Sequence, residues 1–263
     1  MDLHLKNIRA LVTGSTRGLG YATARCLSLE GALVVINGRE DARLQAVVSG
    51  LSAETGSQVF GVAGDVGLPS VAEGLVKTAC DLMGGLDILI CNAGGPPPGA
   101  FESFDDAAWQ KAIDVSFMSN VRLIKAALPF LRKSQAASVL TVTSYSVKQP
   151  IPNLVLSNSI RAATIGLTKS LALELGKDGI RFNSILPAWT ETERVTDLMT
   201  ARAKVNGTTL QTEIARQASE SPLGRMSTPQ EFANVATFLV SPLASYLTGL
   251  MLPVDGGMLK GTF

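Results

Sequence analysis

The segment TGSTRGLG at residues 13–20 constrains the fold of this chain more than any other part of the sequence. It follows an apolar run and opens a stretch of helical periodicity, so we expect a loop between a strand and a helix. Gly14 permits a tight turn, Gly18 lets a phosphate approach the backbone, and Gly20 lets the helix pack on the strand. Because a helix N-terminus offers unpaired N–H groups and a positive dipole, the segment predicts a dinucleotide site.

Apolar and amphipathic segments alternate along the rest of the chain. Strands are expected at residues 9–13, 33–37, 58–63, 86–91, 138–143, 181–186 and 251–254. Helices are expected at residues 19–30, 41–55, 68–83, 109–133, 156–177 and 228–239. Alternating strands and helices form right-handed βαβ units, so we predict a seven-stranded parallel sheet flanked by helices. This is a doubly wound α/β Rossmann fold, with residues 1–263 forming a single domain.

Residues 190–220 depart from this alternation. They are polar, mostly helical in propensity and interrupted by Gly207. Ligands of open α/β sheets bind at the carboxyl ends of the strands, where inserted segments cover them. We therefore expect residues 190–220 to form a substrate-binding lid.

The composition narrows the class of partner and the compartment. Hydrophobic residues make up 46% of the chain and the net charge is +1, which argues against nucleic acid or an anionic membrane as the main partner. The three cysteines, Cys26, Cys80 and Cys91, lack metal-ligand spacing and predict free thiols in a reducing compartment, with no metal site. The polar start of the chain does not resemble a signal peptide, and no apolar run is long enough to span a bilayer. We expect a cytoplasmic protein.

The second predicted strand ends in VINGRE, at residues 35–40, and indicates which dinucleotide is bound. NAD-specific proteins usually carry an acidic residue there, which binds the ribose hydroxyls. Asn37, Gly38 and Arg39 occupy these positions instead. A guanidinium is a bidentate partner for a 2′-phosphate, and Arg17 of the glycine loop is able to join it. The sequence therefore favours NADP over NAD, the alternative being that Arg39 is only a solvated loop cation.

Further motifs resemble those of the short-chain dehydrogenase/reductase (SDR) family. They are GDV at 64–66, CNAGG at 91–95, GIRFNSILPAW at 179–189 and the C-terminal segment at 221–257. The resemblance implies an NAD(P)-dependent oxidoreductase that interconverts a carbonyl and an alcohol by hydride transfer. It also implies a homo-oligomer, a tetramer or a dimer, in which the last helix and strand pack across subunits. The apolar run at 232–240 fits that role, and it fits an intramolecular core equally.

The resemblance also assigns cofactor contacts. Asp65 would bind the adenine, Asn92 to Gly94 would line the ribose, and Thr192 would contact the carboxamide or pyrophosphate. Ala188 stands where the family has a glycine near the nicotinamide. The full set of expected cofactor-binding residues is Gly14, Ser15, Thr16, Arg17, Gly18, Leu19, Gly20, Asn37, Gly38, Arg39, Asp65, Val66, Asn92, Ala93, Gly94, Arg161, Pro187, Ala188 and Thr192.

The catalytic positions depart from the family pattern. Ser144 fits the serine that holds the substrate oxygen, but Ser157 and Arg161 stand where the family has Tyr-x-x-x-Lys, and Ser116 replaces an asparagine of the proton relay. A serine hydroxyl titrates far above the pKa of about 10 of a tyrosine, so a neighbouring cation does not make it a general acid or base near neutral pH. Arg161 is always charged and is still able to bind ribose hydroxyls. Cofactor binding is expected to survive while the usual proton donor is missing.

Other residues offer a substitute for that donor. Tyr145 adjoins Ser144 and either points into the cleft or packs against the lid as a loop tyrosine. Lys148 is a candidate relay group or a surface charge. Glu191 and Glu193 adjoin the nicotinamide loop and are either acid–base groups or solvated lid charges.

The segments LSNSIR at 156–161 and NAGGPPPG at 92–99 resemble an SDR subgroup labelled 3-oxoacyl-[acyl-carrier-protein] reductase-like. That label follows overall similarity and says little about substrate. The three prolines stiffen the loop, either to shape the pocket mouth or only as a structural brace. Two functions follow from the sequence: an NADP-dependent oxidoreductase with an atypical proton donor, or a catalytically silent nucleotide-binding protein.

Overall fold

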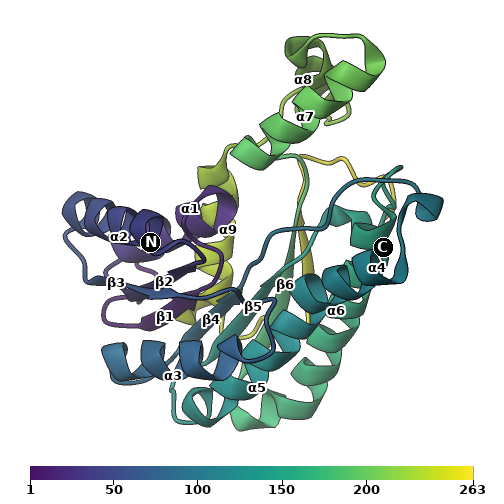
Figure 1. The fold of residues 1–263 in the computed structure, drawn as a ribbon. Coiled ribbons are helices and arrows are strands. Elements are labelled where there is room, and N and C mark those ends of the chain that lie inside the picture. Colours follow the sequence, from purple (N-terminus) through teal and green to yellow (C-terminus); the bar gives the residue numbers. More distant parts are fainter. Residues whose placement is uncertain (263) are drawn as a thin grey trace.

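The computed structural model describes residues 1–262 and is built around one seven-stranded parallel sheet (Figure 1). The strand order is β3-β2-β1-β4-β5-β6-β7. The strands are β1 (Arg9–Val12), β2 (Leu33–Gly38), β3 (Val59–Ala63), β4 (Ile88–Cys91), β5 (Ser138–Val142), β6 (Arg181–Pro187) and β7 (Met251–Val254). Each lies within two residues of a predicted apolar run, so the predicted doubly wound sheet is confirmed.

Helices cover both faces of the sheet (Figure 1). One face packs against α1 (Gly18–Leu29), α2 (Asp41–Thr55) and α9 (Pro229–Val240), and the other against α3 (Val71–Met83), α5 (Ser119–Leu131) and α6 (Val155–Leu175). Leu27, Ile36 and Leu239 are fully buried in the first layer. Leu89, Leu131 and Phe182 are buried in the second. Because both faces are covered, the strands are apolar on both sides, which is why they read as unbroken hydrophobic runs.

The helix expected at 109–133 begins earlier, at Asp106, ends at Leu131, and is not regular. It begins as α4 (Asp106–Ile113), because the Asp105 carboxylate accepts a hydrogen bond from the Ala108 N–H and caps the first turn. A π-helical turn, η2 (Asp114–Met118), then separates α4 from α5. Such turns are frequent at functional sites, and this one contains Ser116.

The strand order reverses at β1, which pairs with β2 on one side and β4 on the other. The register places Val12 opposite both Ile36 and Ile90. The loops that follow these three strands therefore leave the sheet side by side, at the switch point where open α/β sheets bind ligands. These are the loops that begin with Thr13, Arg39 and Asn92.

The segment at 190–220 folds as α7 (Glu193–Asn206) and α8 (Leu210–Ser219), which project away from the sheet (Figure 1). The side chains of Thr192 and Thr209 cap the two helices, and Gly207 ends α7 in the left-handed conformation. At the base of the projection, Trp189 and Met199 pack with Tyr145 in a separate buried cluster. Helices α7 and α8 thus pack against Tyr145, which follows β5, and Trp189, which follows β6.

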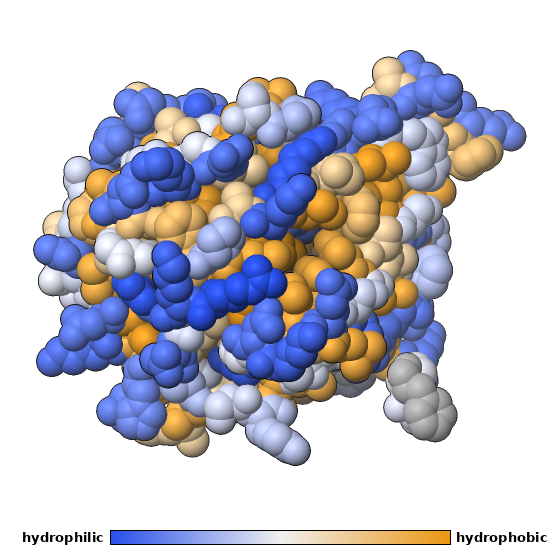
Figure 2. All heavy atoms as spheres, turned by 90° about the horizontal axis from the view of Figure 1, so that it is seen from below, coloured by the Kyte–Doolittle hydropathy of each residue, from blue (hydrophilic) through white to orange (hydrophobic). Residues whose placement is uncertain are grey.

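The apolar run at 232–240 forms most of α9. Phe232, Ala236 and Leu239 are fully buried against the sheet, while Phe238 is 37% exposed. The structure therefore accounts for most of this run as an intramolecular core. Figure 2 views the molecule from below and shows hydrophilic side chains over much of that face, with hydrophobic ones exposed between them. Within residues 1–262, no helix combines the length and the hydrophobicity that crossing a bilayer requires.

Candidate cofactor and active site

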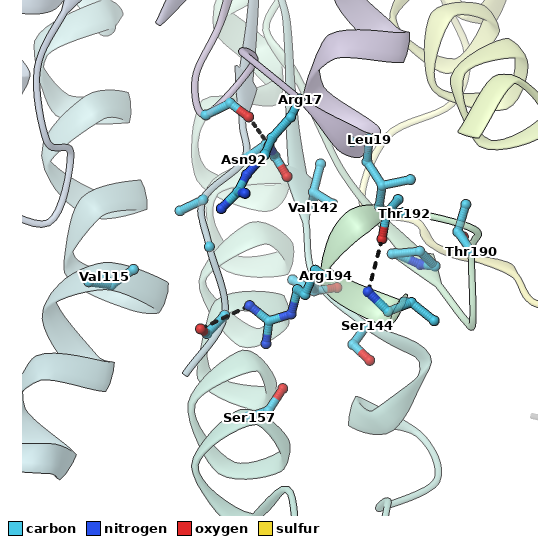
Figure 3. Close-up of a pocket in the computed structure, with 18 of the residues that line it drawn as sticks. Arg17, Leu19, Asn92, Val115, Val142, Ser144, Ser157, Thr190, Thr192 and Arg194 are labelled. Carbon is cyan, nitrogen blue, oxygen red and sulfur yellow. Dashed lines mark hydrogen bonds between the residues drawn. The ribbon is translucent and has the colours of Figure 1, made fainter. Parts of the chain in front are cut away.

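A cavity of about 580 Å³ lies at the switch point and continues beneath the start of α7 (Figure 3). It brings together most of the predicted site residues. Those that line it are Gly14, Thr16, Arg17, Gly18, Leu19, Asn37, Gly38, Arg39, Asp65, Val66, Asn92, Ala93, Gly94, Ser144, Tyr145, Ser157, Arg161, Pro187, Ala188 and Thr192.

Ser15 and Gly20 are the two predicted cofactor residues that do not line this cavity. Ser15 is fully buried, and its hydroxyl donates to the Val12 carbonyl at 2.6 Å, so it braces the loop from behind. A Cβ on Gly20 would lie 2.5 Å from the Gly14 carbonyl oxygen, so this glycine permits close packing of α1 on the loop. Both residues shape the loop rather than face a ligand.

The loop from Gly14 to Gly18 presents backbone donors to the cavity. Both glycines adopt positive φ, 55° and 58°. Helix α1 begins without a side-chain cap, and the N–H groups of Gly18 and Leu19 find no acceptor among the described residues. Unpaired N–H groups at a helix N-terminus bind phosphate, so the geometry fits a pyrophosphate.

Two buried or half-buried amides hold this loop in place. The Asn37 Oδ1 accepts from the Gly14 N–H at 3.2 Å, while its Nδ2 donates to the carbonyls of Val62 and Gly64. The Asn92 Nδ2 donates to the Gly14 carbonyl at 2.9 Å. The side chains of Asn37 and Asn92 are thus engaged with protein backbone, and they fix the shape of the cavity wall.

The adenosine end of the cavity carries two exposed guanidinium groups. Arg39 is 70% exposed, and its Nη1 lies 4.0 Å from an oxygen of Asp65. Arg17 donates to Glu193 of α7 at 3.0 Å, and Arg43 approaches the same carboxylate at 3.4 Å. The hydrogen bond from Arg17 is the largest cause that lowers the pKa of Glu193. Arg17 and Arg39 thus line the same end of the cavity.

The other end of the cavity carries hydroxyl groups. Ser144 caps a short turn that follows β5, and its Oγ accepts from the Ser146 N–H at 3.1 Å. Ser157, near the start of α6, is 8% exposed, and its hydroxyl makes no hydrogen bond within the described chain. Figure 3 shows both side chains at the lower part of the cavity. The pair can hold a substrate oxygen by hydrogen bonds, but neither hydroxyl titrates near neutral pH.

Arg161 is tied to the end of β5, just before Ser144. Its Nη1 donates to the carbonyls of Val142 and Thr143, at 3.0 and 2.7 Å. Burial, and then the charge of Arg194, lower the pKa of Arg161 to about 10. The guanidinium is therefore still protonated at neutral pH. It positions the end of β5 and leaves its remaining N–H groups for the cavity.

Tyr145 combines the two interpretations that the sequence left open. It lines the cavity and also packs with residues of α7 and α8, 5% exposed, where its hydroxyl oxygen accepts from the Trp189 Nε1 at 3.1 Å. Burial is the main cause that raises the pKa of Tyr145 above its ordinary value. Since Trp189 occupies only an acceptor position, the phenol proton is free to be donated.

The remaining candidates for a proton donor differ in position. Lys148 and Glu191 are exposed and do not line the cavity. Glu193 lines it, but its carboxylate is paired with Arg17 and Arg43.

Ser116 lies in the π-helical turn between α4 and α5. Its carbonyl accepts from the Asn120 Nδ2 at 2.9 Å and from the Thr164 Oγ1 at 3.0 Å. Its own hydroxyl is buried and has no partner within the described residues. Two protein side chains therefore occupy the Ser116 carbonyl. This carbonyl is not left free to hold a water molecule of a proton relay.

Arg194 is a site residue that the sequence analysis did not identify. It lines the cavity, and its Nη1 and Nη2 donate to the carbonyls of Gly95 and Pro96 at 2.9 and 3.1 Å (Figure 3). The only available signal was its position two residues after Thr192, which does not reveal a contact with a loop about a hundred residues away.

This fold and site define a dinucleotide-binding α/β protein with hydroxyl groups at the reactive end of its cavity. The model of a family described as enoyl-(acyl carrier protein) reductase matches residues 14–259. Dehydrogenase/reductase SDR family member 4 of Bos taurus is 37% identical over 260 residues, which cover 97% of this chain and 88% of that protein. The chain belongs to the short-chain dehydrogenase/reductase family.

Two solved structures extend the comparison. L-sorbose reductase from Gluconobacter frateurii, complexed with NADPH and L-sorbose, has a TM-score of 0.95 and 32% identity, covering 99% of this chain and 100% of that one. An NADPH-bound short-chain oxidoreductase from Pseudomonas aeruginosa PAO1, described as containing an atypical catalytic center, has a TM-score of 0.88 and 31% identity. In that comparison 96% of this chain and 97% of the other are covered.

Proposed function

We propose that this protein is an NADP-dependent oxidoreductase that interconverts a carbonyl and an alcohol. One observation carries the proposal: a single cavity joins the glycine loop, the arginines of its adenosine end and the hydroxyl of Ser144. Two solved relatives that contain NADPH support the choice of cofactor. Arg17 and Arg39 would hold its 2′-phosphate, and the N–H groups of Gly18 and Leu19 its pyrophosphate.

NADPH, when bound, supplies the hydride. Ser144 would orient the substrate oxygen by a hydrogen bond, and Ser157 would offer a second one. Arg161 holds the end of β5 and thus the position of Ser144. The proton would come from Tyr145 or from solvent, because Ser157 replaces the family tyrosine and does not act as an acid near neutral pH.

Three finer features belong to the same proposal. Residues 190–220 would act as the substrate lid, since α7 contributes part of the cavity wall. The protein would be a cytoplasmic homo-oligomer, which the free cysteines and the exposed apolar residues Phe238, Leu243 and Tyr246 support. Within the SDR family, the protein would belong with the 3-oxoacyl-[acyl-carrier-protein] reductase-like subgroup. That membership does not define an acyl-carrier substrate.

A turnover screen with a matched pair of variants tests the proposal. Purified protein is assayed with NADPH against a panel of ketones and aldehydes, and with NADP against alcohols. We expect Ser144→Ala to lower kcat/KM about 100-fold or more, in line with the loss of one donor to a developing oxyanion, while NADPH affinity stays unchanged. Ser146→Ala is the control, because that buried hydroxyl makes no hydrogen bond within residues 1–262 and does not line the cavity.

The second candidate is a catalytically silent nucleotide-binding protein. It is favoured by one observation, which is that Ser157 and Arg161 supply neither a phenol nor an amine at the catalytic positions. Fluorescence titration that shows tight NADPH binding, together with no turnover across the whole panel, would select this function over the first.

A further inference from the structure

Two guanidinium groups in the cavity have no carboxylate to balance them. Arg161 and Arg194 each donate hydrogen bonds to backbone carbonyls, and within residues 1–262 no carboxylate oxygen lies within 4.0 Å of either group. Arg161 is half-buried and Arg194 is exposed, so each keeps some contact with water. Two like charges that share one cavity without a carboxylate favour an anionic ligand there.

The charges around the Arg194 guanidinium support this interpretation. Partial desolvation at the cavity, and then the charge of Arg17, lower the pKa of Arg194, while the residue as a whole is exposed. Arg194 in turn helps to lower the pKa of Arg161. An anion bound between these groups would relieve both effects.

The acidic side chains of the lid do not fill this role. Glu193 is directed to Arg17 and Arg43, at the nucleotide end. Asp197 lines the cavity, but it is not within 4.0 Å of a cation among the described residues. A bound molecule would therefore supply the anion.

The position of Arg194 identifies which molecule. Its guanidinium lies against the loop at Gly95, where a Cβ would come 2.5 Å from its Nη2, so the loop has a glycine where the guanidinium rests. Figure 3 shows the side chain reaching from α7 to that loop, above Ser157 and beside Ser144. Two of its five N–H groups are used by carbonyls, and three remain for a ligand near the two serines.

We propose that the substrate of the proposed reaction carries a carboxylate, which binds to Arg194 while its carbonyl group faces Ser144. Guanidinium and carboxylate pair through two parallel hydrogen bonds, so this group suits the free N–H atoms. The same cavity has an apolar part of its lining that would take the rest of the molecule. This apolar part consists of Ile151, Leu154, Trp189, Val195 and Leu198. A keto acid with an aliphatic chain, or the corresponding hydroxy acid, has this chemistry.

Turnover of matched keto acids and esters tests the proposal, which rests on the proposed function. Wild-type protein is assayed with NADPH on 2-oxohexanoate, 5-oxohexanoate and the methyl ester of each. We expect at least one acid to exceed its ester about 10-fold or more in kcat/KM, and Arg194→Gln to abolish that preference through KM. Arg194→Lys should retain part of it, because the charge stays and the paired donors are lost.

Arg132→Gln is the control for net charge. Arg132 pairs with Asp178 on the surface and does not line the cavity, so its removal should leave the acid preference unchanged. Equal turnover of acid and ester by the wild type, or an acid preference that survives in Arg194→Gln, overturns the proposal. So does a large loss of NADPH affinity in Arg194→Gln without a change in acid preference, because the anion is then the cofactor's pyrophosphate.

A binding measurement separates this proposal from the proposed function. Hexanoate and hexanamide are titrated calorimetrically into wild-type and Arg194→Gln protein saturated with NADP. Tighter binding of hexanoate, lost in Arg194→Gln, supports the anion site even if no ketone is turned over. Equal binding of the two compounds overturns it, even if neutral ketones are good substrates.

Discussion

Arg161 stabilises the chain next to the active site and does not take part in proton transfer. Its guanidinium joins α6 to the carbonyls of Val142, the last residue of β5, and Thr143, which follows it; a shorter ammonium group would reach them with fewer donors. With a pKa of about 10 the guanidinium stays protonated at neutral pH, so it does not exchange a proton there. Its contribution to the site is therefore the position of Ser144.

A direct consequence concerns stability. Arg161→Met removes both donors and leaves the Val142 and Thr143 carbonyls without partners, which should cost about 1–3 kcal/mol of the free energy of unfolding. Equilibrium urea denaturation measures this change. Lys148→Met, at an exposed position off the cavity, is the control and should have little effect. A loss equal to that of the control would show that the two carbonyl bonds do not stabilise the fold.

Tyr145 makes a prediction about pH. Burial raises its pKa above the ordinary value of 10, so the phenol is protonated throughout the neutral range and is competent as an acid but not as a base. If Tyr145 is the donor, the rate of carbonyl reduction should fall only as pH rises through this raised pKa. Alcohol oxidation should instead increase with pH towards the same value.

Steady-state profiles of kcat/KM for wild type and Tyr145→Phe check this prediction. The variant should lose the alkaline limb and most of the reduction rate, while its NADPH affinity is retained. A limb near the pKa of a carboxylate, present in both proteins, would assign the proton to another group.

Among the elements, the strands and most helices were predictable because their burial follows from local pattern. Most strand residues are apolar and buried, and α9 starts after the N-cap Thr228, which forms a capping box with Glu231. The π-helical turn at Ser116 was not predictable, because the periodicity of α4 and α5 continues through it. The contacts of α7 were not predictable either. Arg194 meets Gly95 only because α7 leaves β6 in a particular direction, which local sequence does not encode.

The ion pairs that join α7 to the glycine loop and to α2 give a prediction about these elements. Glu193 holds Arg17 and Arg43 at once, so it tethers the first turn of α7 in the absence of nucleotide. Glu193→Gln should weaken the tether and increase amide hydrogen exchange across residues 193–206. Because the pKa of Glu193 is lowered in the fold, the tether is fully present above the ordinary carboxyl pKa and is lost as pH falls through the lowered value.

Hydrogen exchange followed by mass spectrometry measures the effect, with Glu191→Gln as the control. Glu191 is exposed and makes no ion pair within residues 1–262. If both variants exchange like the wild type, the start of α7 is held by the packing of its Met199 with Trp189 and Tyr145 rather than by charge.

At the scale of the whole molecule, the nucleotide site joins parts of the chain that are distant in sequence. Loops after β1, β2, β4 and β6 all contribute to one cavity, so a ligand bound there contacts both halves of the sheet. A ligand that binds only the folded chain stabilises it by RT ln(1 + [L]/Kd), about 2.7 kcal/mol at a concentration 100 times Kd. Cofactor choice should therefore be visible in global stability, without any knowledge of the substrate.

NADPH should raise the Tm of this protein more than NADH does at equal concentration, because only NADPH offers a 2′-phosphate to Arg17 and Arg39. Differential scanning fluorimetry measures both shifts. Arg39→Gln should reduce the NADPH shift towards that of NADH while leaving the NADH shift unchanged, since the two nucleotides share every other contact. Arg17→Gln should act in the same direction but also free Glu193, so its effect on the unliganded Tm separates the tether from the phosphate contact. Equal shifts by both nucleotides in the wild type would mean that Arg39, exposed and 4.0 Å from Asp65, is a solvated loop cation after all.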